Sequence, residues 1–132
     1  MVIQNVKKEI YNILSNQLGY TVVDTPTKSK PNFPWLRIST VNITRKPYGN
    51  NAFEYSMKIS IDIFSDYDGE LEILQIEQNI FNNINQLYSI DGVSRVSGST
   101  LHLFDDKSTG VLIKRGSIVY DITLAGEENV NE

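Results

Sequence analysis

The chain has 132 residues, which is the size of a single domain. Hydrophobic residues make up 40% of it, charged residues 21%, and the net charge at pH 7 is −4. The absence of cysteine excludes disulfides, thiolate nucleophiles and cysteine-based zinc sites. The acidic balance also argues against nucleic acid as the main partner.

The beginning of the chain lacks the basic region and apolar block of a secretory signal. No apolar run approaches the roughly 20 residues that span a bilayer. We therefore expect the protein to be made in a cytosol and used there, or in a particle assembled there.

An amphipathic helix of about 16 residues is predicted first, because apolar side chains recur at steps of three and four. Gly19 stands where a left-handed cap would end this helix. Residues 20–23 are predicted as a short strand. Residues 24–34 contain three prolines, which favour a loop. The apolar positions of the helix are Val6, Ile10, Ile13, Leu14 and Leu18.

Two strand patterns follow and form a predicted β-hairpin. Residues 35–44 are rich in β-branched side chains, and their apolar positions change parity, which predicts a bulge near Thr40. Residues 45–51 have the composition of a turn. Residues 53–64 alternate strictly between apolar and polar, as in a strand with one buried face. We expect the tip of this hairpin to project from the body.

A second helix is predicted over residues 69–88, with Asp68 as its N-terminal cap. Two more strands are predicted at 93–104, with a bulge at Gly98, and at 111–124, joined by a turn at 105–110. The buried stripe of the helix is formed by Ile73, Ile76, Ile80, Phe81, Ile84, Leu87 and Tyr88.

The predicted order is therefore α-β-β-β-α-β-β. It indicates an α+β fold, with a largely antiparallel (mixed) sheet of four to five strands and two helices packed on one face. We expect residues 1–124 to form one domain. Residues 125–132 are predicted to be a mobile acidic tail.

No pattern of catalytic or metal-binding residues stands out. The single histidine, His102, lies within a strand pattern and has no partner at a useful spacing, so we expect a structural or surface role. The acidic residues between Asp62 and Glu72 do not fit an EF-hand loop, because Phe64 and Gln75 would occupy two ligand positions. Helix capping accounts for Asp68, Glu70 and Glu72. We predict no cofactor, no metal and no catalytic residue.

Basic and aromatic side chains gather between residues 28 and 50. Such residues anchor protein interfaces, and they also bind single-stranded nucleic acid. The acidic balance favours a protein interface, and packing of Trp35 in the core is a further alternative. The candidate interface residues are Lys28, Lys30, Phe33, Trp35, Arg45, Lys46, Tyr48 and Asn50.

The segments, taken in order, resemble the tail-completion, or tail terminator, proteins of long-tailed bacteriophages that infect Gram-positive bacteria. The resemblance covers residues 3–124. It rests on the first helix, on a proline-rich loop that leads into Pro-Trp-Leu-Arg-Ile at 34–38, and on the strand that ends Ile-Ser-Ile-Asp-Ile-Phe-Ser at 59–65. The Ile-rich helix and the closing strand at 115–122 complete it.

This resemblance implies a non-enzymatic virion protein with an α/β fold. Its subunits would form a ring, usually a hexamer, that caps the tail tube, stops tail growth and joins the tail to the head. The implied partners are copies of itself, the tail tube protein and a head completion or connector protein. The implied location is the head–tail junction of a virion assembled in the bacterial cytoplasm. Cations such as Lys28 and Arg45 would contact passing DNA if they lined the ring.

Two other functions remain open from the sequence. One is a head-side connector or neck protein of the same kind of particle. The other belongs to a different class: a small acidic α/β enzyme or ligand-binding domain, which would use the carboxylates between Asp62 and Glu72 to hold a metal or ligand.

Overall fold

In a computed structural model, the predicted α+β fold and the order of its elements are confirmed. The structure describes residues 2–23, 32–47, 52–66, 69–84, 95–106 and 113–127. The helical elements are α1 (Val2–Asn12), a π-helical turn η1 (Ile13–Gln17) and α2 (Leu71–Ile84). The strands are β1 (Thr21–Val23), β2 (Trp35–Pro47), β3 (Ala52–Ser65), β4 (Arg95–Asp106) and β5 (Ile113–Glu127).

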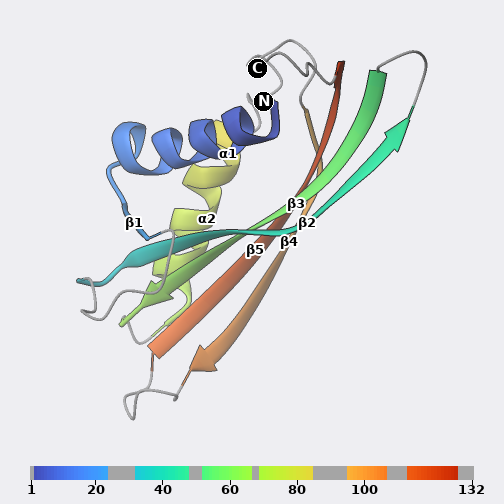
Figure 1. Cartoon of the computed structure of the whole chain (residues 1–132). Helices are drawn as coiled ribbons and strands as arrows, with labels where there is room; N and C mark the ends of the chain where they lie inside the picture. Colours follow the sequence, from blue (N-terminus) through green and yellow to red (C-terminus); the bar gives the residue numbers. More distant parts are fainter. Residues whose placement is uncertain are drawn as a thin grey trace.

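The five strands form one mixed sheet in the order β1-β2-β3-β5-β4. The short β1 pairs in parallel with β2, and the other three neighbouring pairs are antiparallel. Both helices lie on the same side of the sheet (Figure 1). Among the described strands, β4 and the part of β2 beyond Arg37, where pairing with β1 ends, each have an open side.

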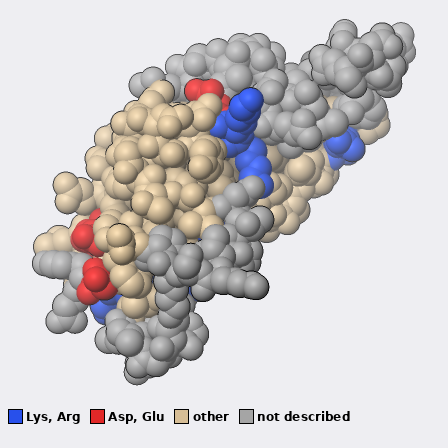
Figure 2. Space-filling model, turned by 60° about the vertical axis from the view of Figure 1, so that its left-hand side comes forward, with Lys and Arg blue, Asp and Glu red and all other residues tan. Residues whose placement is uncertain are grey.

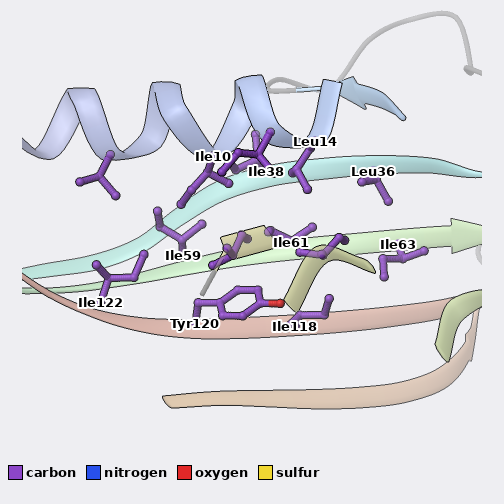
Figure 3. Close-up of a cluster of buried hydrophobic side chains, with 14 of the residues drawn as sticks. Ile10, Leu14, Leu36, Ile38, Ile59, Ile61, Ile63, Ile118, Tyr120 and Ile122 are labelled. Carbon is purple, nitrogen blue, oxygen red and sulfur yellow. The ribbon is translucent and has the colours of Figure 1, made fainter. Parts of the chain in front are cut away.

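The hydrophobic core lies between the helices and the sheet. Alternate residues of β3 point into it, as the period-two pattern predicts. Ile10 of α1 and Leu14 of η1 lie over Leu36 and Ile38 of β2 (Figure 3). Full burial of each such side chain contributes about 1.5–3 kcal/mol, so this layer supplies most of the drive to fold. The fully buried hydrophobic residues of the three central strands are Leu36, Ile38, Met57, Ile59, Ile61, Ile63, Ile118, Tyr120 and Ile122.

The first helix ends as predicted, at Gly19, which has a φ of 75°. Its last turn is wider than an α-helix, because the amide of Leu18 donates to the carbonyl of Ile13 five residues earlier, at 3.0 Å. Both Ile13 and Leu14 are buried in this turn. The π turn therefore brings two successive residues to the core side.

Both predicted bulges are present. The register of β2 against β3 shifts between Thr40 and Asn42, and that of β4 against β5 shifts between Val96 and Gly98. Because of the first bulge, Ile38 and Ile43 both lie opposite core-facing residues of β3 although their numbers differ in parity.

Several predicted boundaries differ from the structure. Asp105 and Asp106 belong to β4, so their assignment to the turn at 105–110 is wrong. β5 continues to Glu127, three residues past its predicted end, because β3 offers pairing partners as far as Ala52.

Other sequence predictions cannot be compared with the structure. Asp68, the predicted helix cap, lies outside the described residues. So do 85–88 at the end of the predicted helix and 128–132 of the predicted tail.

Gly116 of β5 allows α2 to pack closely on the sheet. A Cβ atom at this position would lie 2.6 Å from Cγ2 of Ile73, which is too close without movement of the helix or its side chain. We expect Gly116→Ala to lower the free energy of unfolding by about 1–3 kcal/mol, measured by urea denaturation. The double variant Gly116→Ala/Ile73→Ala lacks the clashing methyl, so its loss of unfolding free energy should be smaller than the sum of the losses in the two single variants. Losses that add strictly would show that a Cβ atom at position 116 does not clash with Ile73.

The hydroxyl of Tyr120 is buried without a hydrogen-bond partner among the described residues. Burial, with a smaller contribution from the carboxylate of Glu77, raises the pKa of this hydroxyl above its ordinary value. A buried hydroxyl that gains no hydrogen bond on folding still loses its hydration. The core therefore tolerates a polar atom that opposes folding.

We expect Tyr120→Phe to leave the free energy of unfolding unchanged or to raise it by about 1 kcal/mol. The matched control is Tyr20→Phe, because the Tyr20 hydroxyl accepts a hydrogen bond from the Asn79 amide at 3.1 Å. That change should lower the free energy of unfolding by about 0.5–1 kcal/mol. A loss of stability in Tyr120→Phe larger than in the control would show that the hydroxyl has a partner.

Candidate interface surfaces

The face of the sheet opposite the helices carries a group of aromatic and charged side chains that we call the aromatic–arginine cluster. It is held in place by strand register, because Trp35 pairs with Phe64, Phe64 with Arg115, and Arg115 with Phe104. The cluster therefore crosses all four long strands. Its members are Trp35, Arg37, Asp62, Phe64, Phe104 and Arg115.

The aromatic rings and guanidinium groups of this cluster stack on one another. The rings of Trp35 and Phe64 are parallel to within 8°, with their centroids 4.0 Å apart. The guanidinium carbon of Arg115 lies 4.9 Å from the centroid of Phe64 and 5.1 Å from that of Phe104. That of Arg37 lies 5.6 Å from Phe64. These contacts keep the planar cations in fixed positions.

Asp62 lies beneath these arginines and is only 4% exposed. Its Oδ2 is 2.9 Å from Nη2 of Arg37 and 3.4 Å from Nη2 of Arg115. A buried carboxylate oxygen that contacts two guanidinium groups acts as a structural anchor, because it balances the charge of both. The cluster thus has one more positive than negative charge, and both cations are restrained.

The other carboxylates near Asp62 are spread over separate places. Glu72 accepts a hydrogen bond from the Ser65 hydroxyl, and Asp66 is exposed. In the described part of the chain, no three His, Asp or Glu side chains converge as a metal site would require. His102 is exposed on β4. Among the described residues, these carboxylates and His102 therefore do not come together in one place.

The β2–β3 hairpin forms a second surface, which we call the hairpin arm and define as residues 41–47 together with their pairing partners on β3. Every residue of β2 from Thr40 to Pro47 is exposed. Figure 1 shows the hairpin arm extending past both helices. Val41 is 56% exposed and Ile43 41%, which is unusual for apolar side chains on a long strand.

The predicted interface residues fall on different parts of the fold. Arg45 and Lys46 are exposed on the hairpin arm, and the guanidinium of Arg45 lies 5.6 Å from the Tyr55 ring. Phe33 and Trp35 are half-buried at the other end of β2, where Trp35 packs in the cluster. The remaining four lie outside the described residues: Lys28, Lys30, Tyr48 and Asn50.

A third surface lies between α2 and β4, and we call it the α2–β4 groove. It forms an open pocket of about 220 Å³. Leu103 on its wall is 37% exposed, and the neighbouring Phe104 is 43% exposed. Leu103 pairs with Gly116, which has no side chain to cover it. The pocket is lined by Glu70, Ile73, Leu103, Phe104, Asp105, Lys114 and Arg115.

The α2–β4 groove was missed by sequence reasoning. Its apolar wall combines residues from a helix and from an edge strand, and only the strand order brings them together. The glycine opposite Leu103 is the one signal that could have indicated it. The rim is polar, because the amine of Lys114 lies 2.7 Å from the carboxylate of Asp105.

Charged side chains do not form a continuous basic area on the face shown in Figure 2. There, the described lysine, arginine, aspartate and glutamate side chains occupy small separate areas, with a broad uncharged surface between them. Within the described ranges, neither helix has the length and apolar character needed to cross a bilayer.

Comparison with known proteins gives a match at the level of structure alone. No protein-family model matches the chain, and no curated protein matches it. Among solved structures, a chain from the virion of a native gene transfer agent (GTA) particle is similar, with a TM-score of 0.52 and 10% sequence identity. The match covers 89% of this chain and 92% of that one. At this identity the likeness establishes a shared fold over almost the whole of both chains.

We expect Asp62→Asn to lower the free energy of unfolding by about 2–3 kcal/mol, since it leaves two partly buried guanidinium groups without their counter-charge. The control is Asp121→Asn, whose carboxylate lies 3.6 Å from the amine of Lys58 on the exposed surface. That change should cost less than about 1 kcal/mol. Equal losses in the two variants, measured by urea denaturation, would show that Asp62 does not anchor the cluster.

Proposed function

We propose that this chain is a non-enzymatic structural protein of a phage-like virion. The observation that carries this proposal is the fold shared with a chain of the GTA virion, which extends over 89% of this chain and 92% of the other. This coverage supports the proposal, because the shared fold extends over most of both chains.

More specifically, we propose a tail terminator: a ring of copies, six in the commonest case, that caps the tail tube and ends its growth. The same ring would present the surface that joins the tail to the head. Ring subunits need two different surfaces that fit each other, and the fold supplies a helix-bearing face on one side of the sheet and an open face on the other (Figure 1). The proposed partners are further copies, the tail tube protein and a head completion or connector protein.

In this function the protein acts by the shape of its surface and not through a reactive side chain. Among the described carboxylates of the acidic stretch, Asp62 is bound by two arginines and Glu72 by Ser65. These contacts account for both residues without a reaction. Contact between the cations of the hairpin arm and passing DNA stays a prediction, in which Arg45 and Lys46 would act through phosphate charge.

The proposal is tested in the particle that encodes this chain. Deleting the coding sequence should give tails of irregular and increased length that do not attach to DNA-filled heads, as seen by negative-stain electron microscopy. Supplying the intact protein should restore a uniform length. Deletion particles whose tails have normal length and carry heads would overturn the proposal.

A binding experiment separates the tail terminator from a head-side connector. Purified protein is mixed with isolated tail tubes or with isolated filled heads, and the fractions are resolved by sedimentation. A tail terminator should sediment with the tubes in the absence of heads. Sedimentation with heads alone would assign the protein to the head side of the junction.

A further inference from the structure

The side of α2 that faces away from the core carries no charged residue. Every exposed residue of Leu71–Ile84 is a leucine or an amide, and these residues recur at steps of three and four, so they lie along one side of the helix. The buried side of the helix is formed by Ile73, Ile76, Ile80 and Ile84. We call the exposed row the α2 stripe, and it consists of Leu71, Leu74, Gln75, Gln78, Asn79 and Asn82.

The composition of the α2 stripe is typical of a surface that is covered by protein. A helix that faces water ordinarily carries charged residues on its outer side, whereas the centre of a protein interface is depleted of them. Leu71 is 71% exposed and Leu74 42%. In Figure 2, where the side of Figure 1 that carries both helices comes forward, a broad surface is uncharged. The α2 stripe therefore indicates a docking surface.

The amides of the α2 stripe are held by hydrogen bonds and keep groups for a partner. Nε2 of Gln78 donates to Oδ1 of Asn82 at 2.9 Å, and Nδ2 of Asn79 donates to the Tyr20 hydroxyl at 3.1 Å. A carboxamide has two N–H donors and a carbonyl acceptor, so these side chains can form further hydrogen bonds. A surface that offers hydroxyl groups would complement them.

The helix-free side of the sheet, which we call the open face, offers such groups. A row of small uncharged side chains crosses the four long strands at the middle of this face, and we call it the central row. Strand register gives its members as Ser39, Ser60, Val119 and Thr100. The charged residues nearest to it along the strands are Arg37, Lys58, Asp62, Arg115 and Asp121. Three of these are positive and two are negative.

The charges of α2 and of the open face are opposite in sign. Glu70 precedes α2, Glu72 and Glu77 lie in it, and the helix contains no basic residue. Two α2 stripes facing each other would bring six carboxylates together, and the net charge of −4 on each copy adds to that repulsion. Against the open face, the same carboxylates meet an excess of positive charge. The charges thus favour contact between unlike surfaces of two copies.

The two surfaces match in size and lie on opposite sides of the molecule. From Leu71 to Asn82 the α2 stripe is about 16 Å long, at about 1.5 Å per residue. Four strands about 4.8 Å apart are about as wide. Because both helices lie on the same side of the sheet (Figure 1), each copy can present the α2 stripe to one neighbour and the open face to the other. Repetition of such a contact by rotation forms a ring when the angle closes.

We propose that the α2 stripe of one copy packs against the central row of the open face of the next. This deepens the tail terminator proposal and rests on it, because it names the contact by which the ring closes. The occupant of the open face is thus a second copy of this chain.

Cross-linking tests this contact without background, because the chain contains no cysteine. Gln78→Cys, at the middle of the α2 stripe, and Ser117→Cys, beside the central row, are prepared as two single variants and as one double variant. Oligomers of each, formed free in solution or on tails, are treated with a short bifunctional thiol reagent. The double variant should give a ladder of covalent oligomers that ends at the ring size. A mixture of the two single variants should stop at dimers.

Two controls define the surfaces. Each single variant alone should give no dimer, because the proposed contact joins different surfaces. Thr44→Cys, at an exposed position of the hairpin arm, should give no product when combined with Ser117→Cys. Efficient dimers from Gln78→Cys alone would show a two-fold contact between α2 stripes and would overturn the proposal. Efficient dimers from Ser117→Cys alone would overturn it too, because they would show two open faces in contact.

A matched pair of variants tests the role of charge. Gln78→Lys and Gln78→Glu place charges of opposite sign at the same point of the α2 stripe. Because the open face has an excess of positive charge, Gln78→Lys should raise the dissociation constant of the oligomer, free or on tails, about tenfold more than Gln78→Glu does at low salt. The dissociation constants are measured by sedimentation. A larger increase in Gln78→Glu than in Gln78→Lys would contradict the proposed contact.

The outcome separates the contact from the function. Oligomers of uniform mass that give no ladder with the double cysteine variant would overturn the packing of α2 on the open face and leave the tail terminator function standing. Normal tail length and head attachment in deletion particles would overturn the function, whatever the cross-linking shows. A ladder in the double variant together with abnormal tails in the deletion would support both.

Discussion

The structure depends on the pairing of β3 along both of its sides. From Ala52 to Ser65, β3 is paired with β5, and from Phe53 to Phe64 it is also paired with β2. A shift of one residue would turn its isoleucines away from the helices and its polar residues into the core. The burial of one face of β3 therefore fixes the register of the three central strands, and with it the positions of both outer edges.

The aromatic–arginine cluster packs against the other face of β3. A sheet covered by helices on one side would ordinarily leave the opposite side wet, yet Asp62 and Phe64 are buried there by side chains of the same face. Trp35 covers Phe64, and two arginines cover Asp62. This packing restrains the end of the sheet far from the hairpin arm, so the arm extends from a body that is tied together on both faces.

Most of the fold could be predicted from the sequence because its signals are local. Strict alternation marks β3, a 3.6-residue period marks both helices, and a change of parity marks the bulge at Thr40. The cluster and the groove could not be predicted in this way. Asp62 meets Arg37 and Arg115 only through strand order. Leu103 and Ile73 of α2 line the same groove across Gly116, which has no side chain to fill the space. The hairpin arm could be predicted in part. Its projection from the body was expected, but the exposure of Val41 and Ile43 on it was not.

The two β-bulges have a consequence for symmetry. One lies at Val41 in the hairpin arm and the other beside Gly98 in β4, so each open edge carries a single-residue insertion. A bulge increases the local twist of its strand. If copies join through the two faces of this sheet, the angle from one copy to the next depends on that twist, and a contact between unlike surfaces gives a filament whenever the angle fails to close. Two inserted residues would then decide between a closed assembly of fixed copy number and an endless one.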